Sequence, residues 1–495
     1  MNNLTILPII LPVIAGMIMV VFRNQIRMHR ALSLGTLTLI GIVAVMLMGQ
    51  IQQNGIQVLH VGGWHAPFGI SMVADMFSVL LVFTNAVVAF CCIWYAFFSI
   101  GEEREKHFFY PFALFLIAGV NGSFLTGDIF NLFVCFEVML VASYVLITLG
   151  GAKTQLRESL TYVLINMISS FLFLVAIAYL YHMTGTLNMA HLSVRVAEIG
   201  QGGLMTTVAF LFLTVFSLKA GLFLFYWIPG SYGAPPPAIA AIFAALLTKV
   251  GIYAIIRLFS LVFYHEPGTT HYLIGILAAV TMILGAMGAV AFNDIKRIIT
   301  YNVVIGVGLI LAGFASFCEA GLSGSVYYLI HDMIIKGLLF LLGGSIILLT
   351  GTDRIREMSG LIRSYPRLGW MFLITAFSVA GIPPLSGFIG KILITEGAFR
   401  VGYYWLGGLG LLASLMVIYS MLKIFMNVFW GYPDDLESNP RISVRGLLRP
   451  MALLMALTIF LGLGAQGLYG VVDQAVLGLM DPSLYIAAVL DGKLP

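Results

Sequence analysis

The chain has 495 residues, of which 60% are hydrophobic and only 9% are charged, and its formal net charge is +4. A soluble domain carries about 25% charged residues, so this chain has too few polar side chains to cover a soluble surface. The small net charge and the absence of a long basic run argue against nucleic-acid binding, and no polar stretch is long enough for a soluble catalytic domain. The composition therefore predicts a protein that crosses a membrane many times.

Fourteen apolar segments follow one another along the chain, and a membrane span needs roughly 20 apolar residues. They fall at about residues 4–22, 31–49, 76–100, 108–126, 129–149, 160–182, 205–228, 236–263, 272–292, 298–317, 325–350, 368–399, 402–429 and 447–471. Each must be helical, because a lone strand could not satisfy its backbone hydrogen bonds in lipid. The continuous apolar runs exclude a porin-type barrel, whose strands alternate. The predicted fold class is an all-α polytopic membrane protein with about 14 transmembrane helices.

The distribution of basic residues supports this count. Loops after odd-numbered segments hold fifteen Lys and Arg residues, whereas loops after even-numbered segments, with the C-terminal tail, hold three. Because basic loops stay on the cytoplasmic side, we expect an even number of spans and both termini outside. Arg257 and Arg449 lie inside apolar segments, from which we expect them to snorkel to an interface. The N-terminus lacks a basic n-region, so we expect no cleaved signal peptide.

Five charged residues lie well inside the predicted spans: Glu137, Lys219, Lys249, Lys336 and Lys391. A charge at the bilayer centre costs roughly 2.5–3.5 kcal/mol, so five unpaired charges would cost on the order of 12–18 kcal/mol. Each residue could be half of a packing ion pair, but one carboxylate cannot neutralise four lysines. Some lysines must therefore be deprotonated or face water. Since burial favours the neutral form of a lysine, the pattern predicts side chains that can take up and release protons.

The eleventh predicted span carries two further polar side chains, His331 and Asp332, just before Lys336. A membrane histidine is often only a hydrogen-bonding residue. The spacing of His331 and Lys336 places both on roughly one side of the helix, which favours a proton relay. Asp332 could pair with a lysine or face a lumen, and the sequence leaves both alternatives open.

Two spans are interrupted by proline and glycine. The seventh ends in Trp227-Ile-Pro-Gly-Ser-Tyr-Gly-Ala-Pro-Pro-Pro237, and the twelfth contains Gly381-Ile-Pro-Pro-Leu-Ser-Gly387. Proline removes a backbone hydrogen bond, and such irregular backbone is tolerated in a membrane only against protein or a water-filled cavity. A packing kink is the plainer alternative. Because Lys219 and Lys391 lie near these breaks and transporters place ion paths at discontinuous helices, we expect a proton path here.

Metal and redox cofactors have no support in the sequence. It contains no CxxC motif, no HExxH motif and no pair of histidines within the spans that could hold a haem. We therefore expect no cofactor and no metal-binding residues.

Five stretches, in this order, resemble the antiporter-like membrane subunits shared by respiratory complex I, membrane-bound hydrogenases and Mrp-type Na⁺/H⁺ antiporters. They are Phe133-Val-Cys-Phe-Glu-Val-Met-Leu140, Phe216-Ser-Leu-Lys-Ala220, Asn293-Asp-Ile-Lys-Arg297 with Tyr301, His331-Asp-Met-Ile-Ile-Lys336, and Gly381-Ile-Pro-Pro-Leu-Ser-Gly-Phe388 with Lys391. The resemblance covers about residues 65–430. It implies two inverted five-helix repeats with broken helices 7 and 12, divided as 1–107 (helices 1–3), 108–263 (first repeat, helices 4–8), 272–429 (second repeat, helices 9–13) and 430–495 (helix 14 and a short tail).

Within this family, two stretches look like the D component of Mrp antiporters: Ile228-Pro-Gly-Ser-Tyr-Gly-Ala-Pro-Pro-Pro237 and Ala244-Ala-Leu-Leu-Thr-Lys-Val-Gly-Ile-Tyr253. Relatives in complex I usually carry a histidine after the seventh span, and this chain does not. With 495 residues, we also expect neither the lateral helix of the longest complex I homologue nor the extra spans of the Mrp A component. Because the histidine after the seventh span is absent, Lys249 is the expected proton carrier on the eighth span.

The resemblance implies the proton-translocating subunit of a multisubunit Na⁺/H⁺ antiporter, a secondary transporter and not an enzyme, in a bacterial cell membrane. The expected partners are the A, B, C, E, F and G components of the Mrp complex, protons, and Na⁺, with K⁺ or Li⁺ as alternatives. A proton-pumping subunit of a complex I-like quinone oxidoreductase or a membrane-bound hydrogenase is the alternative function.

The expected proton route runs from Glu137 to Lys219, Lys249, Lys336 with His331, and Lys391. Glu137 would hold Lys219 in its charged form, and breaking that pair would release the proton. Neighbouring helices lie roughly 8–10 Å apart and a hydrogen bond spans about 3 Å, so water would have to bridge the gaps.

Overall fold

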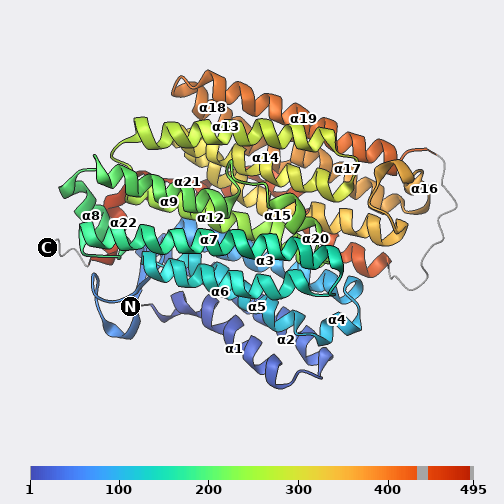
Figure 1. The fold of residues 1–495 in the computed structure, drawn as a ribbon, viewed down its shortest axis with the longest axis horizontal. Helices are drawn as coiled ribbons and strands as arrows, with labels where there is room; N and C mark the ends of the chain where they lie inside the picture. The colour runs from blue at the N-terminus through green and yellow to red at the C-terminus, as the bar shows by residue number, and fades with distance from the viewer. Residues whose placement is uncertain (1, 432–443, 491–495) are drawn as a thin grey trace.

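The computed structural model describes residues 2–431 and 444–490. Figure 1 shows long helices packed side by side, with their axes running in nearly one direction. Within the described residues, eleven helices are long and apolar enough to cross a membrane, and three shorter apolar helices accompany them. These fourteen helices coincide one by one with the fourteen apolar segments, so the predicted helical membrane fold is confirmed.

The crossing helices follow the chain in order. The first eight crossings are α1 (Leu7–Val21), α2 (Ile26–Asn54), α3 (Met76–Ser99), α5 (Phe109–Leu125), α6 (Ile129–Thr148), α7 (Lys153–Thr184), α9 (Leu204–Ala220), and one continuous stretch made of α11 (Pro237–Ile242), the π-helical turn η3 (Phe243–Leu247) and α12 (Thr248–Leu261). The last six are α13 (Pro267–Ala291), α14 (Ile295–Ala315), α15 (Glu319–Thr350), α17 (Pro366–Ala380) together with α18 (Ser386–Arg400), α19 (Tyr404–Val428) and α20 (Val444–Leu463).

Short elements close the two ends of the bundle. One end carries α8 (Met189–Ile199), α22 (Pro482–Val489) and an antiparallel hairpin of β1 (Gln57–His60) and β2 (Ser71–Ala74), and the first helical turn η1 (Asn3–Ile6) also contacts this hairpin. The opposite end carries α4 (Glu102–Lys106) and α16 (Leu361–Ser364). The chain therefore starts and ends its described part on one side, as an even number of crossings requires.

The loops that hold most of the basic residues lie at the end of α4 and α16. This separation of charge between the two ends agrees with the sequence count, although Arg441 and Lys493, which entered that count, lie outside the described residues.

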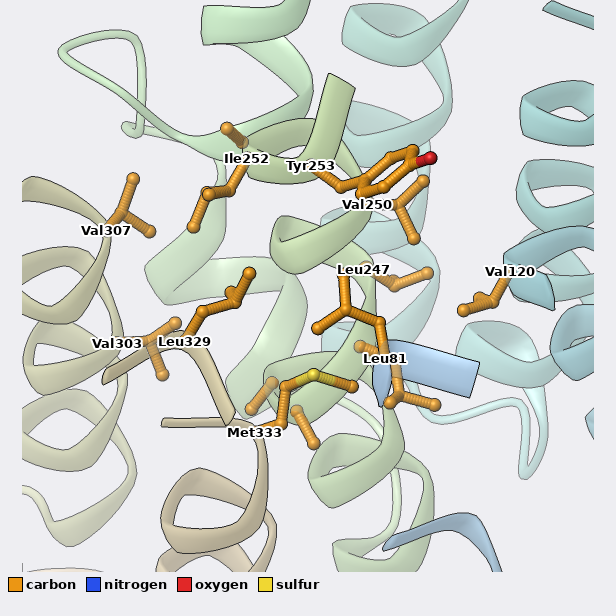
Figure 2. Close-up of a cluster of buried hydrophobic side chains, with 14 of the residues drawn as sticks. Leu81, Val120, Leu247, Val250, Ile252, Tyr253, Val303, Val307, Leu329 and Met333 are labelled. Atoms are coloured by element: carbon orange, nitrogen blue, oxygen red, sulfur yellow. The ribbon is translucent and has the colours of Figure 1, made fainter. Parts of the chain in front are cut away.

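The centre of the bundle consists of mostly apolar helices that are buried on every side. The stretch from Pro237 to Leu261 is buried along its whole length, and α14 and α15 are nearly so. Figure 2 shows side chains from α3, α5, η3, α12, α14 and α15 meeting in one cluster, with Leu247 near its middle. A helix that is apolar all round belongs in such a core, whereas α2, α7 and α19 on the outside present many exposed apolar side chains to lipid.

Two details of the predicted topology are wrong. The last apolar segment does not continue to residue 471, because α20 ends at Leu463 and a separate helix, α21 (Ala465–Met480), begins after Gly464. Arg257 does not snorkel to an interface: its side chain is 3% exposed and its Nη2 lies 2.6 Å from Oδ2 of Asp75. Because Asp75 begins α3 at the end of the hairpin, a buried partner is available and the guanidinium has no need to reach water.

Candidate functional site

Both predicted helix breaks are present, and a lysine lies near each of them. Helix α9 ends at Gly221 with φ of 76°, so Lys219 stands in its last turn. Helix α17 ends at Gly381 with φ of 84°, a left-handed conformation that glycine adopts without strain. Lys391 reaches back from α18 and donates to the carbonyls of Val379 and Ala380 at 2.9 and 2.8 Å. A cation is favoured here because the last carbonyls of a helix lack N–H partners and carry partial negative charge.

Glu137 and Lys219 meet through a serine. Ser170 on α7 donates a hydrogen bond to the Glu137 carboxylate of α6, and Lys219 Nζ lies 3.4 Å from the Ser170 hydroxyl. The ammonium also lies 4.9 Å from the ring centroid of Phe136, within cation–π range. Three helices thus assemble the acid and the base with one hydroxyl between them, where the sequence predicted a direct pair.

A local change of helix geometry presents Lys249. The π turn η3 interrupts the eighth crossing just before this residue, and Lys249 Nζ donates to the carbonyl of Ala244 in that turn at 2.9 Å. A π turn changes the usual pattern of backbone hydrogen bonds and is frequent at functional sites. It turns the following helix so that the Lys249 side chain faces α15.

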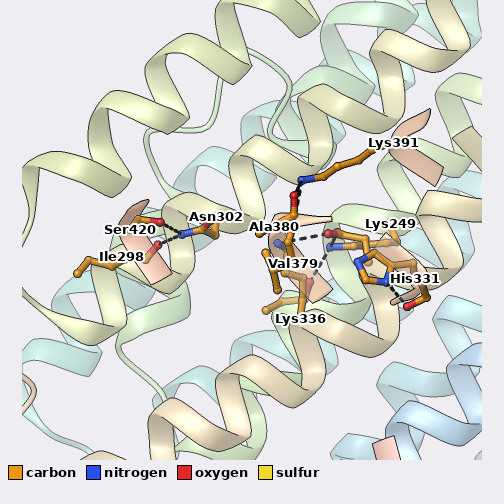
Figure 3. A network of polar contacts seen from close by, with 12 residues as sticks. Lys249, Ile298, Asn302, His331, Lys336, Val379, Ala380, Lys391 and Ser420 are labelled. Atoms are coloured by element: carbon orange, nitrogen blue, oxygen red, sulfur yellow. Dashed lines mark hydrogen bonds and ion pairs between the residues drawn. The ribbon is translucent and has the colours of Figure 1, made fainter. Parts of the chain in front are cut away.

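Asp332 is the hub of a buried cluster that includes Lys249 and Lys336, both labelled in Figure 3. Its Oδ2 lies 2.8 Å from Lys249 Nζ, and its Oδ1 lies 3.4 Å from Lys336 Nζ one turn further along α15. All three side chains are at most 1% exposed. Gly306 of α14 leaves room for the carboxylate, because a Cβ at that position would come within 2.6 Å of Oδ1. One negative charge is therefore shared by two lysines from two helices.

His331 makes its hydrogen bond to the broken helix. Its Nδ1 lies 2.8 Å from the hydroxyl of Ser386, the first residue of α18. Five residues beyond Ser386 on the same helix stands Lys391. His331 thus connects α15 to the segment that carries Lys391, while Lys336 remains on the side of Asp332.

The six predicted residues therefore form separate groups and not one continuous chain. Glu137 joins Lys219, and Lys249 joins Lys336, but no hydrogen bond in the described part of the chain connects Lys219 with Lys249 or His331 with Lys391. Two buried polar atoms on the helices that carry these groups, Oγ of Ser217 and Nε2 of His331, have no hydrogen-bond partner among the described residues. Since buried polar groups are nearly always satisfied by protein or ordered water, water is the natural bridge at these points.

A cavity lies beside the last lysine of the row. It has a volume of about 770 Å³ and is lined by Lys391, by Thr395 one turn further on, and by Glu396 and Arg400 near the end of α18. Glu396 and Arg400 form an ion pair of 2.6 Å, and both side chains are exposed. The cavity therefore reaches from the buried lysine to charged groups at the end of the bundle that carries the hairpin.

Several polar residues of this region could not be assigned from the sequence. The sequence leaves two roles open for Asp332, and its four-residue spacing to Lys336 is the available signal for the pair. Ser170 and Ser386 gave no signal beyond being hydroxyls within apolar segments. Lys423, which the sequence left without a role, donates to the carbonyls of Val290 and Phe292 at the end of α13. In the part of the chain that the structure describes, no group of three or more His, Cys, Asp or Glu residues is placed to hold a metal ion.

Comparison with known proteins agrees with this architecture. The family model described as NADH:quinone oxidoreductase/Mrp antiporter, TM matches residues 126–417. A protein of Bacillus subtilis (strain 168), named as the D component of a Na(+)/H(+) antiporter, is 48% identical over 491 residues, which cover 99% of this chain and 100% of that protein. A chain in the structure of the Mrp complex from Dietzia sp. DQ12-45-1b has a TM-score of 0.92 at 28% identity, covering 99% of this chain and all of that one.

A chain of the membrane-bound sulfane sulfur reductase, an archaeal respiratory membrane complex, has a TM-score of 0.91 at 26% identity and covers 99% of this chain and 100% of that chain. The same fold thus occurs in an antiporter complex and in a respiratory complex. Because the family model spans more than half of the chain and the Bacillus relative matches it from end to end, this protein belongs to the family of membrane subunits shared by NADH:quinone oxidoreductases and Mrp antiporters.

Proposed function

We propose that this chain is the proton-translocating subunit of a multisubunit Na⁺/H⁺ antiporter. The names of the relatives that are 48% identical to it support antiport over the respiratory alternative, since the respiratory neighbour is only 26% identical. The chain is then part of a secondary transporter and not an enzyme. Its partners are the other components of an Mrp-type complex in a bacterial cell membrane.

The observation that carries the proposal is the carboxylate of Asp332 shared by Lys249 and Lys336. All three side chains are buried, and one carboxylate can neutralise the positive charge of only one lysine. Both lysines therefore cannot be charged and neutralised at the same time. The proton that is held in excess can leave toward either side with little rearrangement, because both ammonium groups already contact the same acid. Such a group is a store for one mobile proton in the middle of the membrane.

The other groups supply the steps before and after this store. Glu137 and Ser170 stabilise Lys219 as a cation at the end of α9, and a change in their contact releases its proton toward Lys249 through water. His331 and Ser386 lie between Asp332 and the segment of Lys391. Lys391 then exchanges its proton through the cavity that ends at Glu396 and Arg400.

The orientation and the internal division follow from the same proposal. With the basic loops in the cytoplasm, the hairpin and α22 face outside, and so do both termini. The inverted repeats are residues 108–263 and 272–429, each with its broken helix in fourth place. The two lysines occupy different sides of the breaks, since Lys219 precedes Gly221 whereas Lys391 follows Gly381.

The proposal is tested by replacing Lys219, Lys249 and Lys391 one at a time with Arg and with Ala. Arginine keeps the charge but effectively never deprotonates, so a proton carrier fails with Arg whereas an ion-pair partner tolerates it. We expect each Arg variant to lose Na⁺-dependent proton flux in everted vesicles while its membrane abundance stays near normal. Lys423→Arg is the matched control, because Lys423 is only partly buried, binds carbonyls at the end of α13 and lies outside the proposed route, so the variant should keep its flux. Full flux with Arg at all three positions would end the proton-carrier assignment.

A further inference from the structure

A second polar site lies far from the row of lysines, in a groove between α17 and α20. The groove has a volume of about 710 Å³ and opens at the end of the bundle that carries α16. Arg367, near the start of α17, and Arg445 and Arg449, near the start of α20, line it together with Trp370. Three guanidinium groups from two helices thus gather at one rim, beside an indole that is 59% exposed.

Three of the other arginines at the same end of the bundle are held by carboxylates, and what sets Arg367, Arg445 and Arg449 apart is that they line one groove together. Arg30 is 2.9 Å from Glu105, Arg297 is 3.7 Å from Asp294, and Arg354 is 3.1 Å from Glu357. Among the described residues, no carboxylate forms an ion pair with any of the three arginines in the groove. A topological anchor needs only a basic loop, whereas three guanidinium groups over one groove, without an ion-pair partner among the described residues, match an anion.

The floor of the groove shows what kind of anion fits. Below the rim, the lining is apolar and comes from both helices, including Met371, Ile374 and Met455. From Arg367 to Ile374 and from Arg445 to Met455 the helices rise about 10–15 Å toward the membrane centre. This length is close to the roughly 15 Å of hydrocarbon in one leaflet. A water-soluble anion would leave this apolar floor empty.

We propose that the groove binds an anionic phospholipid, with its phosphate at the three arginines and an acyl chain along the floor. Basic pockets between transmembrane helices on the cytoplasmic side are suited to acidic headgroups, and an exposed tryptophan at the rim lies at the level where indoles favour the interface. Arg groups hold phosphate through two parallel hydrogen bonds, which makes them better suited than lysines to a single headgroup.

Trp370 provides the readout. The full-length protein is reconstituted in phosphatidylcholine vesicles that contain brominated phosphatidylglycerol or, separately, brominated phosphatidylcholine, whose acyl chains quench nearby tryptophans. The chain has six tryptophans, and subtracting the signal of Trp370→Phe isolates the one in the groove. We expect the relative lipid affinity obtained from Trp370 quenching to favour phosphatidylglycerol over phosphatidylcholine roughly ten- to hundredfold. The reason is that each basic group near the surface contributes about 1 kcal/mol to the binding of an anionic lipid.

Replacing Arg367, Arg445 and Arg449 together with Gln should remove this preference. The matched control replaces Arg23, Arg27 and Arg157, three exposed arginines at the same end of the bundle, and should leave the preference intact. Equal quenching by both lipids in the unmodified protein would overturn the proposal, and so would a preference that survives in the triple variant. Inorganic phosphate at millimolar concentration should not displace the lipid, and displacement would assign the site to a free anion. If the preference disappears when the protein is in its assembled complex, another component of that complex covers the groove and the lipid assignment fails.

Discussion

Replacing Asp332 with Asn removes the only negative charge that the structure places between Lys249 and Lys336. With an effective dielectric constant of about 20, a charge pair at the observed 2.8 Å gains about 6 kcal/mol and one at 3.4 Å about 5 kcal/mol. Measured costs of removing one partner from a buried pair are smaller, about 3–5 kcal/mol. Either figure is a large part of the 5–15 kcal/mol that stabilises a typical domain. The variant can avoid this cost only by keeping both lysines neutral.

We therefore expect Asp332→Asn to lose antiport at least tenfold and to lower membrane abundance or thermal stability at the same time. The rate is measured as Na⁺-dependent recovery of an acridine dye signal in everted vesicles, and abundance is measured by immunoblot. A double variant with Asp332→Asn and Lys336→Gln restores the net charge of the cluster. Its abundance should recover, whereas transport should remain absent because the shared acid is still missing.

Two results would refute this reasoning. Normal antiport by the single Asn variant would show that the carboxylate holds no transported proton. Recovery of transport in the double variant would show that Asp332 and Lys336 are a structural pair whose joint removal is harmless.

Three other experiments test separate parts of the molecule. Glu137→Gln should abolish antiport at near-normal membrane abundance, because the carboxylate provides the charge that stabilises Lys219. Ser170→Ala should only slow antiport, because the hydroxyl carries no charge. Normal antiport in vesicles of the Gln variant would remove Glu137 from the route. A cysteine at exposed Asn54 should react with an impermeant maleimide added to whole cells, and reaction only in everted vesicles would reverse the orientation. Arg257→Gln strands buried Asp75 and should cost about 3–5 kcal/mol, seen as a lower melting temperature that the double change with Asp75→Asn partly restores; an unchanged melting temperature in the single variant would contradict a stabilising pair.

The number of helices and the positions of the two breaks could be predicted because both depend on short-range sequence. An apolar run of about 20 residues must be a membrane helix, and a proline cluster within it must interrupt the hydrogen bonds. The same reasoning placed Lys219 and Lys391 beside breaks. The same reasoning predicts a last helix that is too long. The residues after Gly464 are apolar enough to continue the helix, and only packing shows that they form another one.

The pairing of the charges was harder to predict. Arg257 and Asp75 come from distant parts of the chain, and nothing near Arg257 in the sequence indicates an acid. The contact between Lys249 and Asp332 depends on the turn that η3 gives to the eighth crossing, and an ordinary helical pattern contains no sign of that turn. Local patterns therefore identified which side chains were costly to bury, while three-dimensional packing decided which of them meet.

The π turn η3 also bears on how this protein can change over generations. It holds one residue more than an α-helical turn would, as a single inserted codon leaves behind. Deleting that codon would give an uninterrupted helix that still inserts, but one residue corresponds to about 100° of rotation, so Lys249 would leave Asp332. A descendant of this gene could thus become inactive while every charged residue remained in its sequence.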